Sequence, residues 1–327
     1  MTVTLGFEVE LIRRTQLLPC DANLTDDIRT NEALLTLEGS SMYWLCRAFF
    51  MLTALILANA VCAADSSPTK PLILAVHPYL PHDEIVSRFK PLADYLARSV
   101  GRPVQVRVGT NYEEHIAAIG TDSVDIAYMG PVPYVKLVAQ YGRKPLLVRQ
   151  EVDGQPFLKG EIIVRQDSPL QSLSELKGKR FLFGDADSTM GTTVPRLMLA
   201  KAGVPLDSLG DYQFLKGHEN VAMGVLAGDY DAGAVKEEVF QKFAPKGLRV
   251  LAHAPLLHDH LFVTSARLPA ALVDSLRSLL LKLNEIPEGR SIMTSIHPGM
   301  SALVSPKDRE YNNVREIMGL ETLAISH

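Results

Sequence analysis

A turn rich in acids and hydroxyls lies in the middle of the chain, within the stretch KGKRFLFGDADSTMGTTVPRL, residues 177–197. An apolar run leads into Asp185 and Asp187, and Ser188 and Thr189 follow at once. Residues of these types support three chemistries: nucleophilic attack by an aspartate beside a metal ion, calcium binding, or the seating of an oxyanion at the start of a helix. A structural interpretation, in which the aspartates only fix the turn and cap the helix, stays open beside them.

The spacing of the two aspartates is compatible with the active site of one class of enzyme. An apolar strand followed by Asp-x-Asp-x-Thr resembles the haloacid-dehalogenase-type phosphatases, in which Asp185 would attack phosphorus and Asp187 would act as acid and base beside magnesium. The remaining parts of such a site would have to come from Lys216, Asp229 and Asp231. Because the motif lies deep in the chain, and Met190-Gly191 follows where an apolar continuation is expected, the phosphatase is the less favoured alternative. A calcium loop fits still less well, because the spacing lacks the sixth-position glycine and the final glutamate.

The oxyanion interpretation uses the hydroxyls. Ser188 and Thr189 stand where a helix is expected to begin, and the first N–H groups of a helix have no intrahelical partner and carry partial positive charge. Gly191 lets the backbone approach a bound group closely. Such donors can hold a phosphate-like anion without Lys or Arg. We therefore favour an anion-binding turn.

Apolar strands and amphipathic helices alternate from about residue 72, which predicts an α/β fold with mostly parallel sheets flanked by helices. A mostly helical tail is expected from Leu268. In such sheets, ligands bind where strands run into the helices that follow. Polar and aromatic residues at these turns are therefore expected to share one cleft, formed by His77 to Tyr79, Asn111-Tyr112, Tyr128 to Gly130, Asp185 to Thr193, Gly217-His218 and Asp231 to Glu238.

The segment 42–64 is predicted to be a secretory signal peptide, which places the mature protein in the periplasm. A single Arg47 precedes an apolar run, and small residues precede a cleavage point after Ala63 or Ala64. Acylation of Cys62, as in a lipoprotein, is the less favoured alternative. Residues 1–41 are interpreted as a non-structural extension or a mis-called start.

Composition narrows the possible partners. The 327 residues carry a net charge of −4 and include no basic run, so we expect no nucleic-acid partner. All three cysteines, Cys20, Cys46 and Cys62, fall at or before the predicted cleavage point. The mature chain would then have no disulfide, thiol nucleophile or cysteine metal site. We expect neither a metal nor a cofactor, and a weak zinc interpretation of His258-Asp259-His260 lacks a third ligand.

Three segments in order carry a resemblance to a known family: DIAYMGPVPYV, GDADSTMGTTVPRLML and LKGHENVAMGVLAGDYDAGAV. They resemble the signature segments of periplasmic binding proteins of phosphonate, phosphite and phosphate ABC transporters, over about residues 72–283. The resemblance implies a two-lobed type 2 periplasmic-binding fold that closes on its ligand by two hinge strands. Lobe one is expected to comprise 72–155 plus 262–327, and lobe two 160–258, with hinges at 153–160 and 253–260.

The resemblance also implies site residues. The family's Ser-Thr-Ser-Gly anion turn matches Ser188 to Gly191, where Met190 has lost the third hydroxyl and Thr192 or Thr193 is expected to compensate. The family's histidine matches His218 and its tyrosine matches Tyr112. The family's acidic residue that binds the tail of the ligand, which often carries an amine, corresponds to Glu238. A late aspartate falls on Asp259 or its neighbour His260, and an aromatic wall falls near Phe157. Lys236 has no family role, and two interpretations stay open for it: a cation at this strand end that strengthens anion binding, or a solvated side chain.

Each of these residues has a plainer interpretation: Tyr112 as a surface aromatic at a helix start, His218 as an N-cap-region histidine, and Glu238 as a solvated first-turn acid. The function implied is capture and not catalysis. A monomeric periplasmic receptor would bind a small phosphorus oxyanion or organophosphonate and deliver it to an ABC-transporter permease. A ligand-sensing subunit for a membrane signalling protein is the alternative that shares the same pocket.

Overall fold

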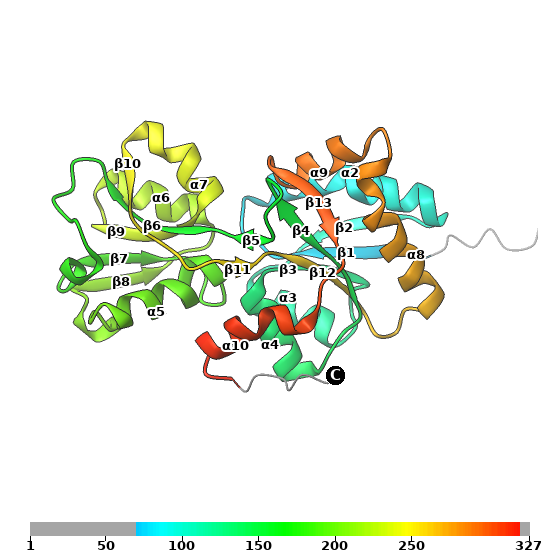
Figure 1. The fold of residues 1–327 in the computed structure, drawn as a ribbon, viewed down its shortest axis with the longest axis horizontal. Coiled ribbons are helices and arrows are strands. Elements are labelled where there is room, and N and C mark those ends of the chain that lie inside the picture. Colours follow the sequence, from blue (N-terminus) through cyan, green and yellow to red (C-terminus); the bar gives the residue numbers. More distant parts are fainter. Residues whose placement is uncertain (1–69, 321–327) are drawn as a thin grey trace, which may run out of the picture. The chain divides into compact units, whose positions relative to one another are not determined.

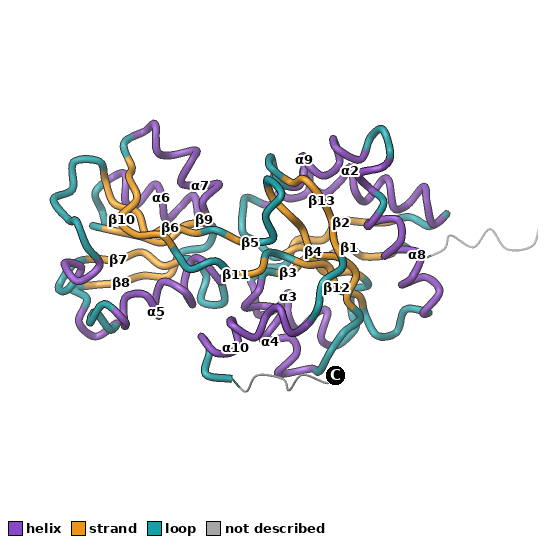
Figure 2. Tube along the Cα trace, viewed as in Figure 1, coloured by secondary structure: helices purple, strands orange, loops and turns teal. Residues whose placement is uncertain are grey.

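The two β-sheets of this computed structural model take their strands from different parts of the chain (Figures 1 and 2). The structure describes residues 70–320, which belong to one unit that begins at Pro68. The predicted extension 1–41 and signal peptide 42–64 lie outside the described residues. Within residues 70–320, no helix is both long enough and apolar enough to cross a membrane.

The first sheet, which we call lobe one, has six strands in the order β13-β4-β12-β3-β1-β2. Their bounds are Leu72–Val76 (β1), Val104–Val108 (β2), Ile126–Met129 (β3), Leu146–Val152 (β4), Leu261–Thr264 (β12) and Met300–Val304 (β13). The helices of this lobe are His82–Val100 (α2), Tyr112–Gly120 (α3), Pro131–Tyr141 (α4), Ala270–Leu281 (α8), Gly289–Ile296 (α9) and Asn312–Ile317 (α10).

The second sheet, lobe two, has five strands in the order β10-β6-β9-β7-β8. Their bounds are Gly160–Arg165 (β6), Arg180–Phe183 (β7), Asp211–Phe214 (β8), Ala232–Lys236 (β9) and Leu248–His253 (β10). Its helices are Val194–Lys201 (α5), His218–Ala227 (α6) and Glu237–Phe243 (α7), and a π-helical turn at Thr189–Thr193 precedes α5. Single 3₁₀ turns lie at Leu173–Leu176, Leu206–Ser208, Ala244–Lys246, Leu283–Glu285 and Asp308–Tyr311.

The prediction of mostly parallel sheets is wrong, because both sheets are mixed. β1 pairs in parallel with β2 and β3, and β7 with β8 and β9, as strand–helix–strand units require. The remaining pairs are antiparallel. These pairs involve strands that adjoin the passages between the lobes, where no crossover helix imposes a parallel return. The expected helical tail likewise contains β13, which pairs with β4.

Two short strands, β5 (Phe157–Leu158) and β11 (Leu257–His258), pair antiparallel between the two sheets. They fall inside the segments expected to be hinges. One hydrophobic cluster continues through this region, because Leu158, Met190 and Leu257 pack with residues of lobe one such as Val132 and Val263. The two lobes are therefore joined by both backbone and core in the described unit.

Candidate functional site

The turn that joins β7 to α5, which we call the Ser188 turn (residues 184–193), holds its shape through its own hydroxyls. The Ser188 Oγ accepts a hydrogen bond from the Gly191 N–H at 3.0 Å, as a helix N-cap does. The Thr192 Oγ1 donates to the Gly184 carbonyl at 3.1 Å. Both side chains are buried. The hydroxyl of Thr192 is thus engaged within the turn.

Glycine at 191 is required by close packing. A Cβ there would lie 2.8 Å from the Ser188 Oγ and 2.9 Å from the Gly184 Cα, which is closer than such atoms approach. The neighbouring Met190 points elsewhere: its side chain is 1% exposed and packs against Gly160, where an added Cβ would lie 2.8 Å from the Met190 Cβ. The side chain at position 190 therefore belongs to the apolar core beside the hinge.

The Ser188 turn faces lobe one. The Thr189 Oγ1 accepts a hydrogen bond at 3.0 Å from the Val132 N–H, in the first turn of α4. Asp187 forms an ion pair with Lys136 on the same helix. Burial raises the pKa of the Tyr112 hydroxyl, on α3, and the neighbouring Ser188 acts in the opposite direction, so the two side chains lie near each other. In this conformation the lobes therefore meet at the predicted anion turn.

Four helical N-termini converge on this meeting point. α3 begins at Tyr112, α4 at Pro131, the π-helical turn at Thr189 and α6 at His218. The His218 Nε2 lies 3.5 Å from the Ser188 Oγ, which brings α6 to the turn. Unpaired N–H groups and the positive ends of helix dipoles favour a negatively charged group. The corner can therefore stabilise an anion without a cation in the turn itself.

Histidines and tyrosines from lobe one line the opposite side. His77 Nδ1 and His115 Nε2 each lie 3.1 Å from the Tyr128 carbonyl, which can only accept, so both nitrogens donate. The His77 ring stacks on His260 at 5.2 Å and lies 4.9 Å from the Tyr112 ring. These contacts fix the rings as a rigid, buried wall.

A buried chain of three groups runs from this wall toward lobe two. The His260 Nδ1 lies 2.8 Å from the Asp259 carboxylate and donates to it, which leaves Nε2 as an acceptor. The Lys236 Nζ donates to that Nε2 at 3.2 Å and lies 4.2 Å above the Tyr79 ring. Asp259 thus orients His260, and His260 and Tyr79 orient the ammonium.

Burial keeps the histidines of this region neutral. Burial lowers the pKa of His218 to about 3 and the pKa values of His115 and His260 to about 4. Burial also lowers the pKa of Lys236 to about 8, although Asp259 and Glu238 act in the opposite direction. At neutral pH the imidazoles therefore carry no charge, and Lys236 is mostly protonated.

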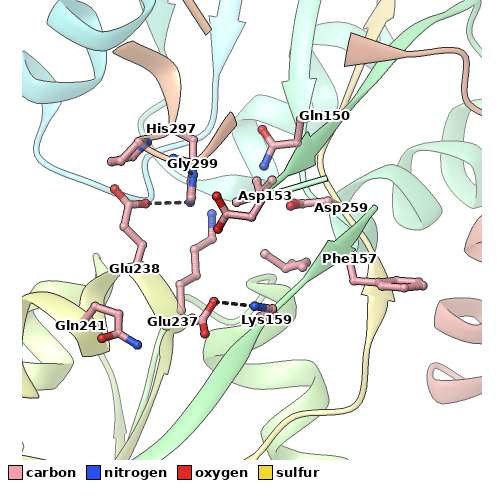
Figure 3. A pocket seen from close by; sticks show the side chains of 14 residues that line it. Gln150, Asp153, Phe157, Lys159, Glu237, Glu238, Gln241, Asp259, His297 and Gly299 are labelled. Carbon is pink, nitrogen blue, oxygen red and sulfur yellow. Dashed lines mark hydrogen bonds and ion pairs between the residues drawn. The ribbon is translucent and has the colours of Figure 1, made fainter. Parts of the chain in front are cut away.

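A cavity of about 290 Å³ opens beside the hinge strands, and we call it the hinge cavity (Figure 3). Polar groups of both lobes line it, together with apolar side chains such as Phe157 and Leu158. Its acidic residues and lysines are Asp153, Lys159, Lys236, Glu237, Glu238 and Asp259. Among the predicted site residues, Glu238 and Asp259 line this cavity, while the others lie in the packed corner at the Ser188 turn.

Glu238 is held by lobe one. Its Oε1 pairs with the Arg88 guanidinium of α2 at 2.6 Å, and its Oε2 lies 3.6 Å from the His297 Nε2. Despite burial, His297 and Arg88 lower the pKa of the Glu238 carboxyl. The carboxylate expected to read the tail of a ligand is therefore already paired across the lobes.

The predicted residues fall into two groups. Tyr112, Ser188, Thr189 and His218 lie at the meeting point of the lobes, with Gly191 and Thr192 inside the Ser188 turn, and Glu238 and Asp259 line the hinge cavity. Sequence reasoning missed Arg88, which stands in the middle of α2 and gives no sequence signal of its own. It left open whether Lys236 strengthens anion binding or is solvated, and it gave His260 only as the neighbour of Asp259. The contact between Lys236 and His260 depends on how β9 and β12 are placed in space.

The alternative chemistries find less support in the geometry. Asp187 is engaged by Lys136, and the Asp185 carboxylate accepts from the Asp187 N–H at 3.1 Å, as in a capped turn. Asp231 is paired with Arg180 at 3.0 Å. Among residues 70–320, no group of three or more His, Cys, Asp or Glu could hold a metal ion, and His258 Nδ1 is bonded to the Glu310 carbonyl at 2.8 Å.

Comparisons with known proteins agree with the resemblance seen in the sequence. Residues 74–311 match a family described as "ABC transporter, phosphonate, periplasmic substrate-binding protein". A probable ABC transporter phosphite-binding protein, PhnD1 of Prochlorococcus marinus, is 22% identical over 287 residues, covering 82% of this chain and 96% of its own. The phosphate-import protein PhnD of Mycolicibacterium smegmatis is 23% identical, covering 68% of this chain and 77% of its own.

Solved structures share the fold. The structure of P. marinus PhnD1 in complex with methylphosphonate matches with a TM-score of 0.70 at 22% identity, over 76% of this chain and 97% of that one. A binding protein component of a phosphonate ABC transporter from Pseudomonas aeruginosa matches with a TM-score of 0.70 at 20% identity, over 76% and 86%. The predicted type 2 periplasmic-binding fold is thereby confirmed.

Proposed function

The chain belongs to the family of periplasmic substrate-binding proteins of phosphonate ABC transporters, and from this premise we propose that it captures a small phosphorus oxyanion between its two lobes. The relatives differ in the ligand that their names give, which is phosphite, phosphate or methylphosphonate. A tetrahedral phosphorus centre with negative oxygens is common to all three. We assign this class of ligand to the chain.

The observation that carries the proposal is the position of the Ser188 turn. The Thr189 hydroxyl of lobe two accepts a hydrogen bond from the Val132 N–H of lobe one, and the Ser188 hydroxyl lies near Tyr112 of lobe one. Neutral donors from both lobes therefore meet at one buried point, beside the N-terminal residues of three α-helices and of the π-helical turn. This is the environment that an oxyanion prefers when it must be both held and released.

Capture would follow from hinge motion. When the lobes part at the segments around β5 and β11, the Thr189 hydroxyl leaves the Val132 N–H, and both become free to bind oxygens of the ligand. Closure then places the anion between the Ser188 turn and the wall formed by Tyr112 and His77. The imidazole of His218, whose Nε2 lies 3.5 Å from the Ser188 Oγ, adds one further neutral polar group at this point.

The test is calorimetric titration with phosphite, phosphate, methylphosphonate, 2-aminoethylphosphonate and sulfate. Wild-type protein should bind at least one phosphorus oxyanion more tightly than sulfate. Ser188→Ala with Thr189→Ala should weaken that binding at least ~100-fold, because two or more hydrogen bonds to a charged group are lost. The double variant should also lose about 1–2 kcal/mol of apo stability, since both hydroxyls satisfy backbone N–H groups.

A matched control is Thr121→Ala with Ser275→Ala. These hydroxyls are exposed and bond only to helix carbonyls in lobe one. The control pair should bind as the wild type does. Unchanged affinity in the Ser188 and Thr189 double variant would remove the site assignment, and a wild type that binds none of the phosphorus oxyanions would remove the function.

Delivery, location and assembly complete the proposal. The receptor would act in the periplasm after loss of segment 42–64, as a monomer, and would present its closed form to an ABC-transporter permease. Its role is binding and not catalysis. The family match and the relatives give no support to a phosphatase or to a sensory subunit.

A further inference from the structure

Lys236 is the one cation of the hinge cavity that no carboxylate contacts directly in the described part of the chain. The acids Glu237, Glu238 and Asp259 already have partners, at 3.4 Å from Lys159, 2.6 Å from Arg88 and 2.8 Å from His260 respectively. Asp153, the remaining acid, is exposed. No carboxylate oxygen lies within 4.0 Å of the Lys236 Nζ among residues 70–320. A half-buried ammonium without a counter-charge is costly unless a bound anion supplies one.

The side chains in direct contact with the Lys236 ammonium orient it and carry no negative charge. The neutral His260 Nε2 accepts at 3.2 Å, and the Tyr79 ring lies 4.2 Å below. Asp259 holds the His260 ring in the tautomer that makes this acceptor available. Three buried side chains thus fix a charge at the end of β9, between the lobes.

This charge borders the space in front of the Ser188 turn. The His260 Nε2 and the Thr189 Oγ1 lie 3.3 and 3.5 Å from the point that a Cβ on Gly130 would occupy. Because residue 130 is glycine, no side chain fills that point. Lys236, which contacts the same His260 nitrogen, therefore stands where the packed corner and the hinge cavity adjoin.

We propose that Lys236 is a ligand-binding residue that pairs with the negative oxygens of the captured phosphorus oxyanion, and that the site prefers ligands without an ammonium tail. The inference rests on the proposed function and deepens it. A ligand tail that enters the hinge cavity meets the Lys236 ammonium and finds Glu238 already paired with Arg88. Methylphosphonate or phosphite should therefore bind more tightly than 2-aminoethylphosphonate.

The test compares Lys236→Met with wild type by calorimetry and by ligand-induced melting shift, with phosphite, phosphate and methylphosphonate as probes. Affinity should fall roughly 10- to 100-fold, which corresponds to the loss of a charge-assisted hydrogen bond. The melting temperature of the apo protein should stay equal or rise, because methionine packs well on Tyr79 and removes an unbalanced charge. A merely structural lysine would instead lower the apo melting temperature and leave affinity intact.

Lys159→Met is the matched control. Lys159 lines the same cavity but is exposed and already paired with Glu237. Its substitution should change affinity less than about twofold. Equal losses in both variants would overturn the proposal, because they would indicate a general electrostatic effect and no direct contact.

The pH dependence of binding gives a second readout that needs no destabilising variant. The charged and titratable groups that face Lys236 come from every element packed against it, namely Tyr79, Arg88, Glu238, Asp259, His260, His297, His77 and His218. The pKa of Lys236 is lowered to about 8, and its histidine neighbours are neutral above pH about 7. Phosphite and phosphate are mainly dianions in this range.

Wild-type affinity for phosphite or phosphate should therefore fall as pH rises above about 8, by up to about tenfold per pH unit, since binding then requires uptake of a proton. In Lys236→Arg, whose side chain stays charged, the affinity should be flat between pH about 8 and about 9.5. A flat wild-type profile, or a Lys236→Met variant that binds like wild type, would overturn the inference and leave the proposed function standing. A wild type that binds no phosphorus oxyanion would overturn both.

Discussion

The two regions where the lobes meet satisfy their polar groups in different ways. At the Ser188 turn, hydroxyls, backbone N–H groups and neutral histidines are buried and bonded to one another. At the hinge cavity, charged side chains from both lobes surround about 290 Å³ of open space. The first region offers uncharged donors of fixed geometry, which can recognise a tetrahedral anion. The second offers charge and room, which can discriminate between the substituents that such an anion carries.

Acid should damage the packed corner most. The pKa values of His115 and His260 are lowered to about 4 and that of His218 to about 3, chiefly by burial, so the unfolded chain binds more protons below pH 6.5. The free energy of unfolding should have its full value above pH about 6.5. It should fall by several kcal/mol as the pH drops toward 4, on the order of 1.4 kcal/mol per histidine and pH unit. Urea unfolding at a series of pH values measures this.

A control separates histidine from carboxylate effects in that experiment. His218→Asn removes one of the buried imidazoles and should flatten the decline of unfolding free energy between pH 6.5 and 4.5. An unfolding free energy that is constant over this range in wild type would contradict the neutral, buried state of the histidines.

Gly191→Ala should disable the Ser188 turn itself. The new Cβ would meet the Ser188 Oγ at 2.8 Å and the Gly184 Cα at 2.9 Å, so the turn must shift. We expect a loss of about 1–3 kcal/mol in stability and at least ~100-fold in affinity for whichever phosphorus oxyanion binds, because the donors are displaced together. Thermal unfolding and calorimetry would show this. Retained affinity would mean that the turn does not hold the ligand.

Met190→Ser restores the hydroxyl that the family's turn carries, yet it should not strengthen binding. Met190 is 1% exposed and packs in the core against Gly160, so the change should cost about 2–4 kcal/mol of stability. Met223→Ser, at a side chain that is 48% exposed, is the control and should be nearly neutral. A gain in affinity for phosphite or methylphosphonate would show that position 190 does face the ligand.

Arg88→Met should loosen the hinge cavity. It removes the 2.6 Å pair with Glu238 across the lobes, and both side chains are less than one-fifth exposed, so we expect a loss of about 1–3 kcal/mol. With Glu238 released, 2-aminoethylphosphonate should gain affinity relative to methylphosphonate. Arg98→Met, which breaks an exposed pair with Glu288, should cost less than about 1 kcal/mol. If the ratio of the two affinities stays the same in Arg88→Met, Glu238 does not bind the tail of the ligand.

Local sequence patterns predict much of the fold but little of the hinge cavity. The helices α2, α3, α4 and α6 follow from apolar periodicity and from stop signals such as Gly101, which adopts a φ of 64° at the end of α2. The antiparallel direction of β12 and β13 relative to their neighbouring strands could not be predicted from these patterns, because it depends on how the chain returns from lobe two. Strand–helix alternation carries no information on such a return.

The site divides in the same way. Ser188, Gly191 and His218 stand in short motifs at strand–helix turns, so the sequence could bring them forward as candidates. The pairing of Glu238 with Arg88, 150 residues apart, and of Lys236 with His260 arises only when the lobes come together. Met190 shows the limit most clearly, because sequence alignment by motif placed it in the anion turn while packing directs its side chain into the core.

A crystal structure of the protein with methylphosphonate or phosphite tests the central claim most directly. The account predicts phosphorus-bound oxygens within hydrogen-bonding distance of the Ser188 and Thr189 hydroxyls, enclosed between the two lobes. An anion bound outside the interface between the lobes, with the Thr189 hydroxyl still bonded to the Val132 N–H, would contradict it.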